Sequence, residues 1–311
     1  MLTVLKTALE VGLIYGLVAL ALFISFSILN IADLSTDGCF TLGCAVGAML
    51  TIAGHPLLAL PAAMAAGMLS GFITAFLQTR LGVESILAGI ISNTGLYTIN
   101  LAVMGFSSNV SITGRDTVFS LFKALTGGSQ WSTLVLLALL LGVIAVVLIR
   151  FFGTSLGLSI RATGDSLDMV SASSINPKAT ITIGLCLANA LTALAGCLIG
   201  EYNKFCDINL GTGMVTIALA SLIIGEVFAG RRGGIGKRVV CVVLGSIVYR
   251  LIIALALRLN ISAEYFKLVS AVIVAVAIAT PNMKDYVHLA KIRSNARKLR
   301  ALSGKGDETD A

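Results

Sequence analysis

The chain has 311 residues, of which 57% are hydrophobic and 12% charged, and its mean hydropathy is +0.97. A soluble domain carries about 25% charged residues, whereas the segment from Gly38 to Thr79 contains no Asp, Glu, Lys or Arg at all. Because a membrane span needs roughly 20 apolar residues, that segment alone can hold two spans. The composition excludes a soluble enzyme, a nucleic-acid-binding protein and a disordered chain, and it predicts a polytopic membrane protein.

Apolar runs separated by polar breaks predict an all-α bundle of about nine transmembrane helices. The second and seventh runs are short for a simple crossing, and short or broken helices are tolerated where they line a cavity inside the protein. If one of the two is re-entrant, the number of crossings is even. In chain order the expected spans are Val4–Leu29, Phe40–Ala53, Leu57–Gln78, Ser85–Phe106, Thr133–Phe152, Ala179–Gly200, Gly213–Phe228, Val239–Leu257 and Phe266–Thr280.

Basic residues gather in three places, which predicts the cytoplasmic face because cytoplasmic loops are rich in Lys and Arg. They flank the loop between Arg150 and Lys178, crowd the loop from Arg231 to Arg238, and begin the C-terminal tail. With nine spans, the N-terminus and the loops 107–132 and 201–211 lie outside. We expect a transmembrane domain of residues 1–283 and a basic cytoplasmic tail of residues 284–311, in a multi-pass protein of the inner membrane.

Glycines four residues apart occur in four of the apolar runs, a spacing that lets helix backbones approach closely. With 32 glycines in the chain, such pairs also arise by chance. Helix contact and coincidence therefore both remain open. The pairs are Gly12/Gly16, Gly43/Gly47, Gly67/Gly71 and Gly196/Gly200.

Two polar stretches, one from Asn30 and one from Glu201, each contain Gly and lead into a short helix rich in small residues. Asp33 and Asp37 are expected to cap the helix that follows them, since a carboxylate there accepts from free N–H groups and opposes the helix dipole. The alternative is a broken helix whose carboxylates line a translocation path. Three polar residues of the fourth span share a helix face, which should point inward. The candidate path residues are Asn30, Asp33, Asp37, Asn93, Tyr97, Asn100, Asn203 and Asp207.

Glu226 and Arg250 are charged residues inside the seventh and eighth spans. Ionisable groups in a membrane are costly, so they pair with each other or face a cavity. Arg250 lies about 18 Å along a helix beyond Arg238, near the middle of the membrane, and Glu226 lies nearer the cytoplasmic side. We hypothesise a structural Glu226–Arg250 pair, which requires a long reach by the arginine side chain.

The loop between the fifth and sixth spans predicts a short cytoplasmic helix over residues 165–176. Asp165 is the expected N-cap, Asp168 strengthens the helix start, and Pro177 prevents the helix from running on. A helix of two to three turns is unstable alone, so it needs a docking surface such as a groove on a soluble partner. The residues expected at that contact are Asp165, Leu167, Asp168, Met169, Val170, Ser173 and Ser174.

This loop and the following helix, LGLSIRATGDSLDMVSASSINPKATITIGLCLANALTALAGCLIGEYN, resemble the coupling-helix region of ABC importer permeases of the branched-chain amino acid and ribose type. Ser174 departs from the family pattern, which commonly has Gly there. The opening GLIYGLVALALFISFSILNIADLSTDGCFTLGCAVGAML matches the family's first pair of helices. Together with GEVFAGRRGGIGKRVVCVVLGSIVYRLIIALAL, it looks most like the subgroup linked to binding proteins of the tryptophan/tyrosine type. The resemblance extends to about Lys291.

The resemblance implies a permease subunit, not itself an enzyme, that moves a small solute such as an amino acid or related metabolite into the cytoplasm. It implies a homodimer, cytoplasmic ATPase subunits that bind ATP and Mg²⁺, and an external substrate-binding lipoprotein. The helix over residues 165–176 would sit in a groove of the ATPase. The basic tail could contact either that ATPase or anionic lipid.

We expect no nucleotide, cofactor or metal site in this chain. Gly233–Arg238 superficially resembles a P-loop, but an arginine stands where the first Gly should be and Arg238 replaces Ser or Thr. The six cysteines lack CxxC spacing, which favours free thiols. The alternative function is a stand-alone ion-coupled secondary transporter or channel that uses Asp33, Asp37 and Glu226. Such a carrier would need no short capped helix for an ATPase.

Overall fold

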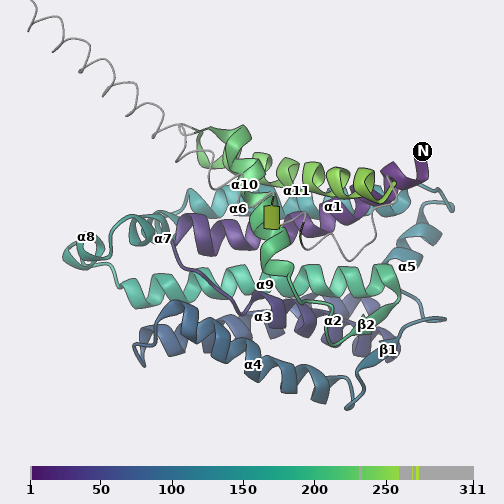
Figure 1. The fold of residues 1–311 in the computed structure, drawn as a ribbon, viewed down its shortest axis with the longest axis horizontal. Coiled ribbons are helices and arrows are strands. Elements are labelled where there is room, and N and C mark those ends of the chain that lie inside the picture. Colours follow the sequence, from purple (N-terminus) through teal and green to yellow (C-terminus); the bar gives the residue numbers. More distant parts are fainter. Residues whose placement is uncertain (1, 231–232, 259–267, 269–270, 273–311) are drawn as a thin grey trace, which may run out of the picture.

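The computed structural model describes residues 2–230 and 233–258, together with residues 268, 271 and 272, and this part of the chain is mostly helical (Figure 1). In chain order the elements are α1 (Leu2–Leu22), the π-helix η1 (Phe23–Ile28), α2 (Thr36–Ile52), α3 (Pro56–Thr79), α4 (Ser85–Val103), β1 (Asn109–Ser111), α5 (Val118–Leu125), α6 (Ser132–Phe152), α7 (Ser155–Asp165), α8 (Leu167–Ala172), α9 (Pro177–Asn203), β2 (Phe205–Asp207), α10 (Met214–Ala229) and α11 (Ile235–Arg258).

Eight of the nine expected spans coincide with helices of the described residues. Six helices are long and apolar enough to cross a membrane: α1 continued by η1, α3, α4, α6, α9 and α11. The two runs predicted to be short form the shorter apolar helices α2 and α10. The ninth expected span, Phe266–Thr280, and the tail 284–311 lie outside the described residues. The number of crossings therefore stays a prediction.

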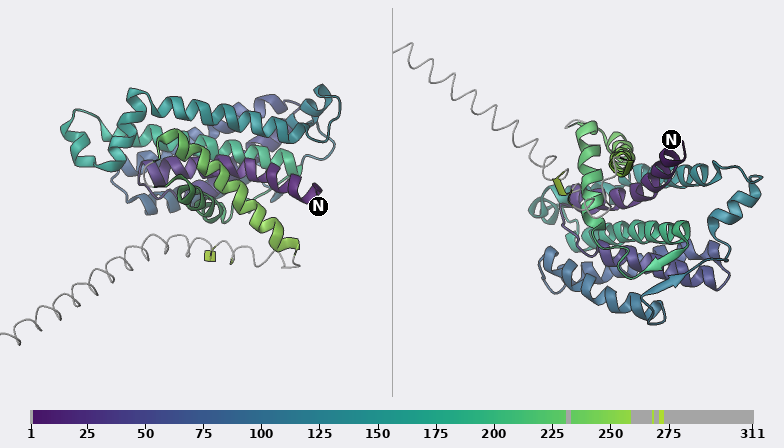
Figure 2. Two further views of the ribbon diagram at one scale, coloured as in Figure 1. Left: turned by 90° about the horizontal axis from the view of Figure 1, so that it is seen from above. Right: turned by 45° about the vertical axis from the view of Figure 1, so that its right-hand side comes forward.

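Helix α9 is the centre of the bundle and the most buried of the six long helices. It packs most extensively against α3 and α2, while α1 packs against α11 and α10 packs against α11 and α1. The long helices α1, α3, α4, α6 and α9 run roughly side by side, whereas α10 crosses that direction (Figures 1 and 2). The two short helices α2 and α10 are thus oriented differently although both begin inside the bundle.

The two loops predicted to lie outside meet at one end of the bundle. Strand β1 pairs antiparallel with β2, with Val110 opposite Cys206, and helix α5 lies at the same end (Figure 1). Thr117 and Ser120 cap α5 reciprocally, and Glu201 Oε2 accepts from the N–H of Val118 at 2.8 Å. The helices α7 and α8 lie at the opposite end, as expected for a loop on the other side of the membrane.

The predicted glycine pairs lie at helix contacts, which confirms the contact interpretation. A Cβ on Gly43 of α2 would fall on the carbonyl of Ala193 in α9, and one on Gly196 of α9 would fall on the carbonyl of Phe40 in α2. Gly67 of α3 and its partner Gly71 face the backbone of α9 in the same way, and Gly12 and Gly16 of α1 face α11. Backbone contact at Gly43, Gly67, Gly71 and Gly196 leaves no room for a side chain.

We predict that Gly43→Ala and Gly196→Ala each lower the stability of the folded protein by about 3 kcal/mol, because the new methyl group meets backbone atoms that cannot move aside. Gly142→Ala in α6 is the control, since nothing lies within 4 Å of the Cβ position of Gly142. That change should leave stability unchanged or slightly improved. Thermal unfolding in detergent micelles measures the difference, and equal midpoints for Gly43→Ala and Gly142→Ala would contradict the packing described above.

Candidate functional site

The carboxylate of Asp37 connects the starts of the two short helices. Its Oδ2 accepts from the N–H of Gly213 and its Oδ1 from the N–H of Val215, both at 2.9 Å. The Thr41 hydroxyl accepts from the N–H of Gly211 at 3.1 Å, and a Cβ on Gly211 would fall on the carbonyl of Asp37. We expected Asp37 to cap the helix that it begins. Instead its oxygens satisfy the first N–H groups of α10, where the helix dipole favours a negative charge.

Asp33 is buried and holds the chain that enters α2. Its Oδ1 accepts from the backbone N–H and the hydroxyl of Ser35, at 2.8 and 2.6 Å. Its Oδ2 accepts from Nδ2 of Asn189 at 2.8 Å. These contacts occupy both oxygens and fix the chain before α2, but none is to an N–H group of that helix, so Asp33 does not cap it as expected. Sequence reasoning did not single out Asn189, although an amide side chain in the middle of the apolar run of α9 is a signal that could have identified it.

The polar face expected on the fourth span is divided in α4. Asn100 is buried and its Nδ2 donates to the Gly38 carbonyl at 3.0 Å. Asn93 also lies at Gly38, since a Cβ there would come within 2.6 Å of Asn93 Oδ1. Tyr97, however, is 52% exposed, so the expectation that it faces inward was wrong. Asn93 and Asn100 are seven residues apart and differ by only about 20° around the helix axis. Tyr97, at i+4, lies roughly 40–60° to one side of both, which is why it can be exposed while they are not.

The other three candidate path residues are Asn30, Asn203 and Asp207. Asn30 is exposed with φ 56°, a left-handed conformation that ends η1 and that Asn tolerates better than most residues. Asn203 is the exposed last residue of α9, and Asp207 in β2 accepts from the N–H of Asn209 at 2.8 Å. These two residues belong to the β1–β2 end of the bundle. A role in the translocation path stays a prediction for all of them.

Glu226 pairs with Arg238, so the hypothesis of a Glu226–Arg250 pair was wrong. Nη2 of Arg238 donates to Glu226 Oε1 at 2.8 Å and to the Ser27 hydroxyl at 2.6 Å, and Ser27 also donates to Glu226. The Arg238 guanidinium lies 5.0 Å from the centre of the Phe23 ring. The hypothesis failed because α11 begins at Ile235, four residues before the expected start at Val239. Arg238 therefore lies in the first turn of α11, beside the end of α10.

Arg250 lies instead over an aromatic ring, with its guanidinium carbon 4.2 Å from the centre of the Tyr15 ring.

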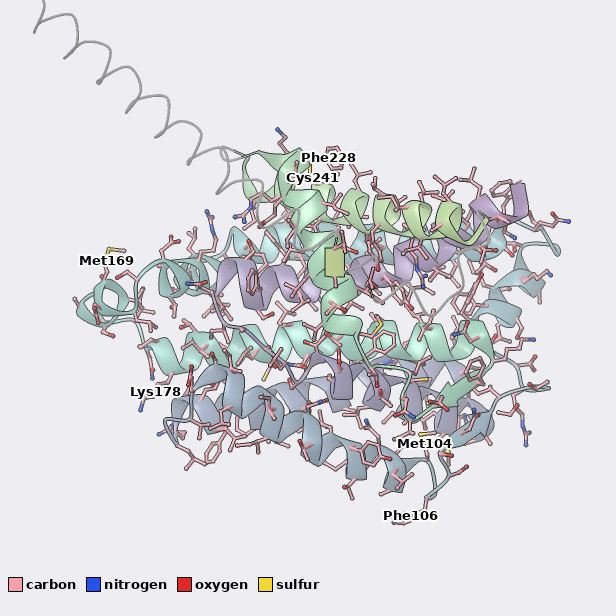
Figure 3. The ribbon with its side chains drawn as sticks, viewed as in Figure 1. Met104, Phe106, Met169, Lys178, Phe228 and Cys241 are labelled. Atoms are coloured by element: carbon pink, nitrogen blue, oxygen red, sulfur yellow. The ribbon has the colours of Figure 1, made fainter. Side chains whose placement is uncertain are left out.

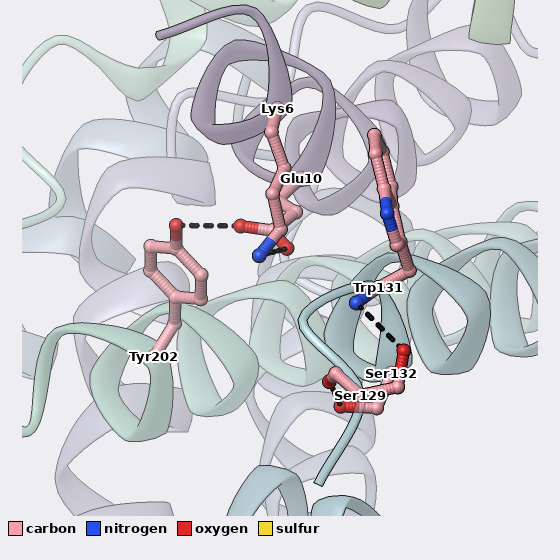
Figure 4. Close-up of polar contacts among 6 residues, drawn as sticks. All are labelled: Lys6, Glu10, Ser129, Trp131, Ser132 and Tyr202. Atoms are coloured by element: carbon pink, nitrogen blue, oxygen red, sulfur yellow. Dashed lines mark hydrogen bonds and ion pairs between the residues drawn. The ribbon is translucent and has the colours of Figure 1, made fainter. Parts of the chain in front are cut away.

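The buried acid of α1 is Glu10, which is 4% exposed. It accepts from the hydroxyl of Tyr202 at 2.9 Å and forms an ion pair with Lys6 at 3.6 Å (Figure 4). Sequence reasoning did not single out Glu10, although a carboxylate within the first apolar span was a visible signal.

The cytoplasmic helix expected over residues 165–176 is the shorter helix α8, Leu167–Ala172, and Ser166 separates it from the preceding helix α7. Asp165 is the last residue of α7 and not an N-cap, which corrects the prediction. Ser166 is extended, with φ −160°, and its hydroxyl accepts from the N–H of Met169 at 3.4 Å to cap α8. Helix α8 ends at Ala172, and Ser174 has φ 60°. A left-handed residue there explains why a glycine would suit this position.

The side chains of α8 point in different directions. Val170 is 1% exposed and packs against the chain itself, so it is not available to a partner, contrary to expectation. Leu167 is 53% and Met169 57% exposed, and Met169 lies at the extreme end of the molecule (Figure 3). Helix α7 rests on the end of η1, because a Cβ on Gly164 would fall on the carbonyl of Ile28. The α7–α8 segment therefore contacts the chain that leads to Asp33 and α2.

Residues 4–278 match the model of a protein family described as branched-chain amino acid transport system, permease component. The chain belongs to this permease family. The permease is 30% identical over 295 residues to a protein of Clostridioides difficile (strain R20291) named tyrosine transport system permease protein, across 94% of this chain and 95% of that one. It is 31% identical over 285 residues to an uncharacterised protein of Rickettsia prowazekii (strain Madrid E), across 91% and 99%. No solved structure matches it.

The family match includes every described helix from η1 to α11 and all but the first residues of α1. Together with six helices long enough to cross a membrane in the described residues, it identifies the permease as a multi-pass inner-membrane component of a transport system. Among the described residues, α2 and α10 begin inside the bundle at the junction formed by Asp37, where regular transmembrane structure is interrupted.

We predict that Asp37→Ala lowers the stability of the permease by about 3 kcal/mol, because two N–H groups of α10 lose their acceptor in a poorly hydrated site. Asp37→Asn keeps one acceptor oxygen and should fall between Asp37→Ala and the wild type. Asp207→Ala is the matched control, since Asp207 accepts within an exposed turn, and it should cost about 1 kcal/mol or less. Thermal unfolding in micelles gives the order, and equal losses for Asp37→Ala and Asp207→Ala would contradict the capping role.

A double-mutant cycle should distinguish the two possible partners of Glu226. Glu226→Gln combined with Arg238→Gln should show a coupling of about 1 kcal/mol, a modest value because both side chains are partly exposed. Glu226→Gln combined with Arg250→Gln should be additive within about 0.5 kcal/mol. The same unfolding measurement serves for both cycles. Coupling to Arg250 in place of Arg238 would restore the original hypothesis.

Proposed function

We propose that this permease is the transmembrane subunit of an ATP-driven importer, which takes a small solute from an external binding protein and releases it in the cytoplasm. Membership of the family supports a transport role. The relative named for tyrosine transport makes an amino acid, and first an aromatic one, the substrate class to test. The ATP would be hydrolysed in a partner subunit, so we expect no ATP or Mg²⁺ bound by this chain.

The observation that carries the ATP-coupled mechanism is the exposed apolar pair on α8. A six-residue helix is too short to be stable by itself, and α8 is held by the Ser166 cap and the buried Val170. Leu167 and Met169, in contrast, are directed away from the bundle with more than half of each side chain exposed. Two large apolar side chains on a capped helix at the end carrying the basic loops fit a groove on a cytoplasmic ATPase.

The contacts of α7 suggest how movement of an ATPase would reach the membrane interior. Gly164 of α7 lies against the backbone of Ile28, and the chain from Ile28 leads to Asp33 and the start of α2. Asp37 then connects α2 with α10. In this proposal, displacement of α8 is transmitted to the junction of α2 and α10, where the polar residues Asp37, Asn93 and Asn100 would border the path of the solute.

The assembly that we propose contains a second copy of the permease, two ATPase subunits and an external binding lipoprotein. The alternative, an ion-coupled secondary transporter, would use the carboxylates of Asp33, Asp37 and Glu226 for ion binding. Their contacts argue against that use, because Asp33 and Asp37 accept backbone and side-chain hydrogen bonds and Glu226 pairs with Arg238. The short docking helix also has no purpose in a stand-alone carrier.

We predict that Leu167→Glu combined with Met169→Glu abolishes association with the ATPase and lowers ATP-dependent uptake at least tenfold, since each change puts a charge into an apolar contact. The permease should remain folded because both side chains are exposed. Phe106→Glu with Leu125→Glu makes the same chemical change at the opposite end, where both residues are exposed, and should retain the ATPase. Co-purification and uptake of labelled tyrosine into proteoliposomes containing all components provide the measurements.

Two results would overturn this proposal. The first is undiminished ATPase association in the Leu167→Glu/Met169→Glu variant. The second is uptake by the permease alone, driven by an ion gradient without ATP, which would favour the secondary transporter. If ATP-dependent uptake occurs with another amino acid and not with tyrosine, the importer is supported and the substrate class is corrected.

A further inference from the structure

A groove opens between the end of α3 and the start of α9, at the end of the bundle that carries the basic loops. Its volume is about 640 Å³. Two aromatic rings, Phe72 and Phe76, form one wall, and the cationic side chains of Arg80 and Lys178 lie at its mouth beside Asn176. We call it the α3–α9 groove. It is separate from the junction at Asp37 and from the exposed residues of α8.

The polar and apolar parts of the groove are arranged by depth. Arg80 follows the last residue of α3, and Phe76 and Phe72 lie about 6 and 12 Å further along the helix at 1.5 Å per residue. Lys178 is the second residue of α9, and Ile183 lies roughly 7.5 Å deeper on the same helix. The cations therefore lie at the level of lipid headgroups, and the apolar wall extends into the level of the acyl chains.

The two cations at the mouth of the groove take part in no ion pair within the described part of the chain. The ion pairs among the described residues join Lys6 to Glu10 and Arg238 to Glu226, and neither involves Arg80 or Lys178. Among the described residues that line the groove, none is acidic. The positive end of α9 lies in the same region, because the helix begins at Pro177 beside Lys178, with Asn176 Oδ1 accepting from its first N–H groups.

We propose that the α3–α9 groove binds an anionic phospholipid of the inner leaflet, with its phosphate on Arg80 and Lys178 and an acyl chain along Phe72 and Phe76. An anionic headgroup fits because the mouth is doubly cationic and its described lining residues offer no carboxylate for the ammonium group of a zwitterionic lipid. A soluble protein would reach the two cations but not the aromatic wall, since Phe72 lies two turns inside the membrane span. The proposal is independent of ATP coupling.

The test uses the full-length permease, delipidated in detergent and titrated with phosphatidylglycerol or phosphatidylcholine, with native mass spectrometry to count bound lipids. We expect one tightly retained phosphatidylglycerol per chain, preferred over phosphatidylcholine about thirtyfold, as two cations near a phosphate suggest. Arg80→Ser with Lys178→Ser should reduce that preference to about twofold or less. Glycerol phosphate, which lacks acyl chains, should not displace the lipid at a comparable concentration.

Two further variants separate the groove from general surface charge. Arg150→Ser with Arg161→Ser removes the same charge from exposed residues of α6 and α7, outside the groove, and should keep the preference. Ala179→Trp adds bulk at an exposed position that lines the groove and should displace the lipid without changing any charge. Three results would overturn the proposal. The two double-serine variants could lose the preference for phosphatidylglycerol equally, or the wild type could retain both lipids equally. The third is undiminished lipid binding in Ala179→Trp.

Discussion

Backbone N–H groups that begin a helix inside a membrane protein need an acceptor, and in this permease one carboxylate supplies it for α10. Asp37 accepts from Gly213 and Val215, and without it these two N–H groups would lack an acceptor where water is scarce. The same residue lies in the first turn of α2, so one side chain links the starts of the two short helices. The loop before α2 is held in place by the buried Asp33, which accepts from Ser35 and Asn189.

Much of the fold follows from patterns that lie within single segments. Runs of apolar residues locate eight helices, because length and hydropathy decide whether a segment can lie in a membrane. Glycine spacing identifies the close contacts of α2, α3 and α9, since Gly43 and Gly196 leave the backbone uncovered on one helix face. The end of the helix before Pro177 is likewise local. These features depend on residues a few positions apart, where helix geometry alone sets the distances.

Pairings between distant segments could not be derived in that way. The partner of Glu226 depends on the turn between α10 and α11, which brings Arg238 beside it and leaves Arg250 beside Tyr15. Asp37 can be assigned as the cap of α10 only if it is known that the chain returns to it after α9 and β2, more than 170 residues later. The break at Ser166 is local, yet Asp165 offered an equally good cap, and only the extended backbone of Ser166 decides between them.

The glycine contacts also determine how the helices could move. Where Gly43 faces the carbonyl of Ala193, sliding α2 along α9 by one residue would press a side chain against that carbonyl. Gly67 and Gly71 impose the same condition on α3. Shear between these helices is therefore blocked, and α2, α3 and α9 should behave as one rigid block. Any opening of the permease must then be a rotation between that block and the layer formed by α1, α10 and α11, with Asp37 at the hinge.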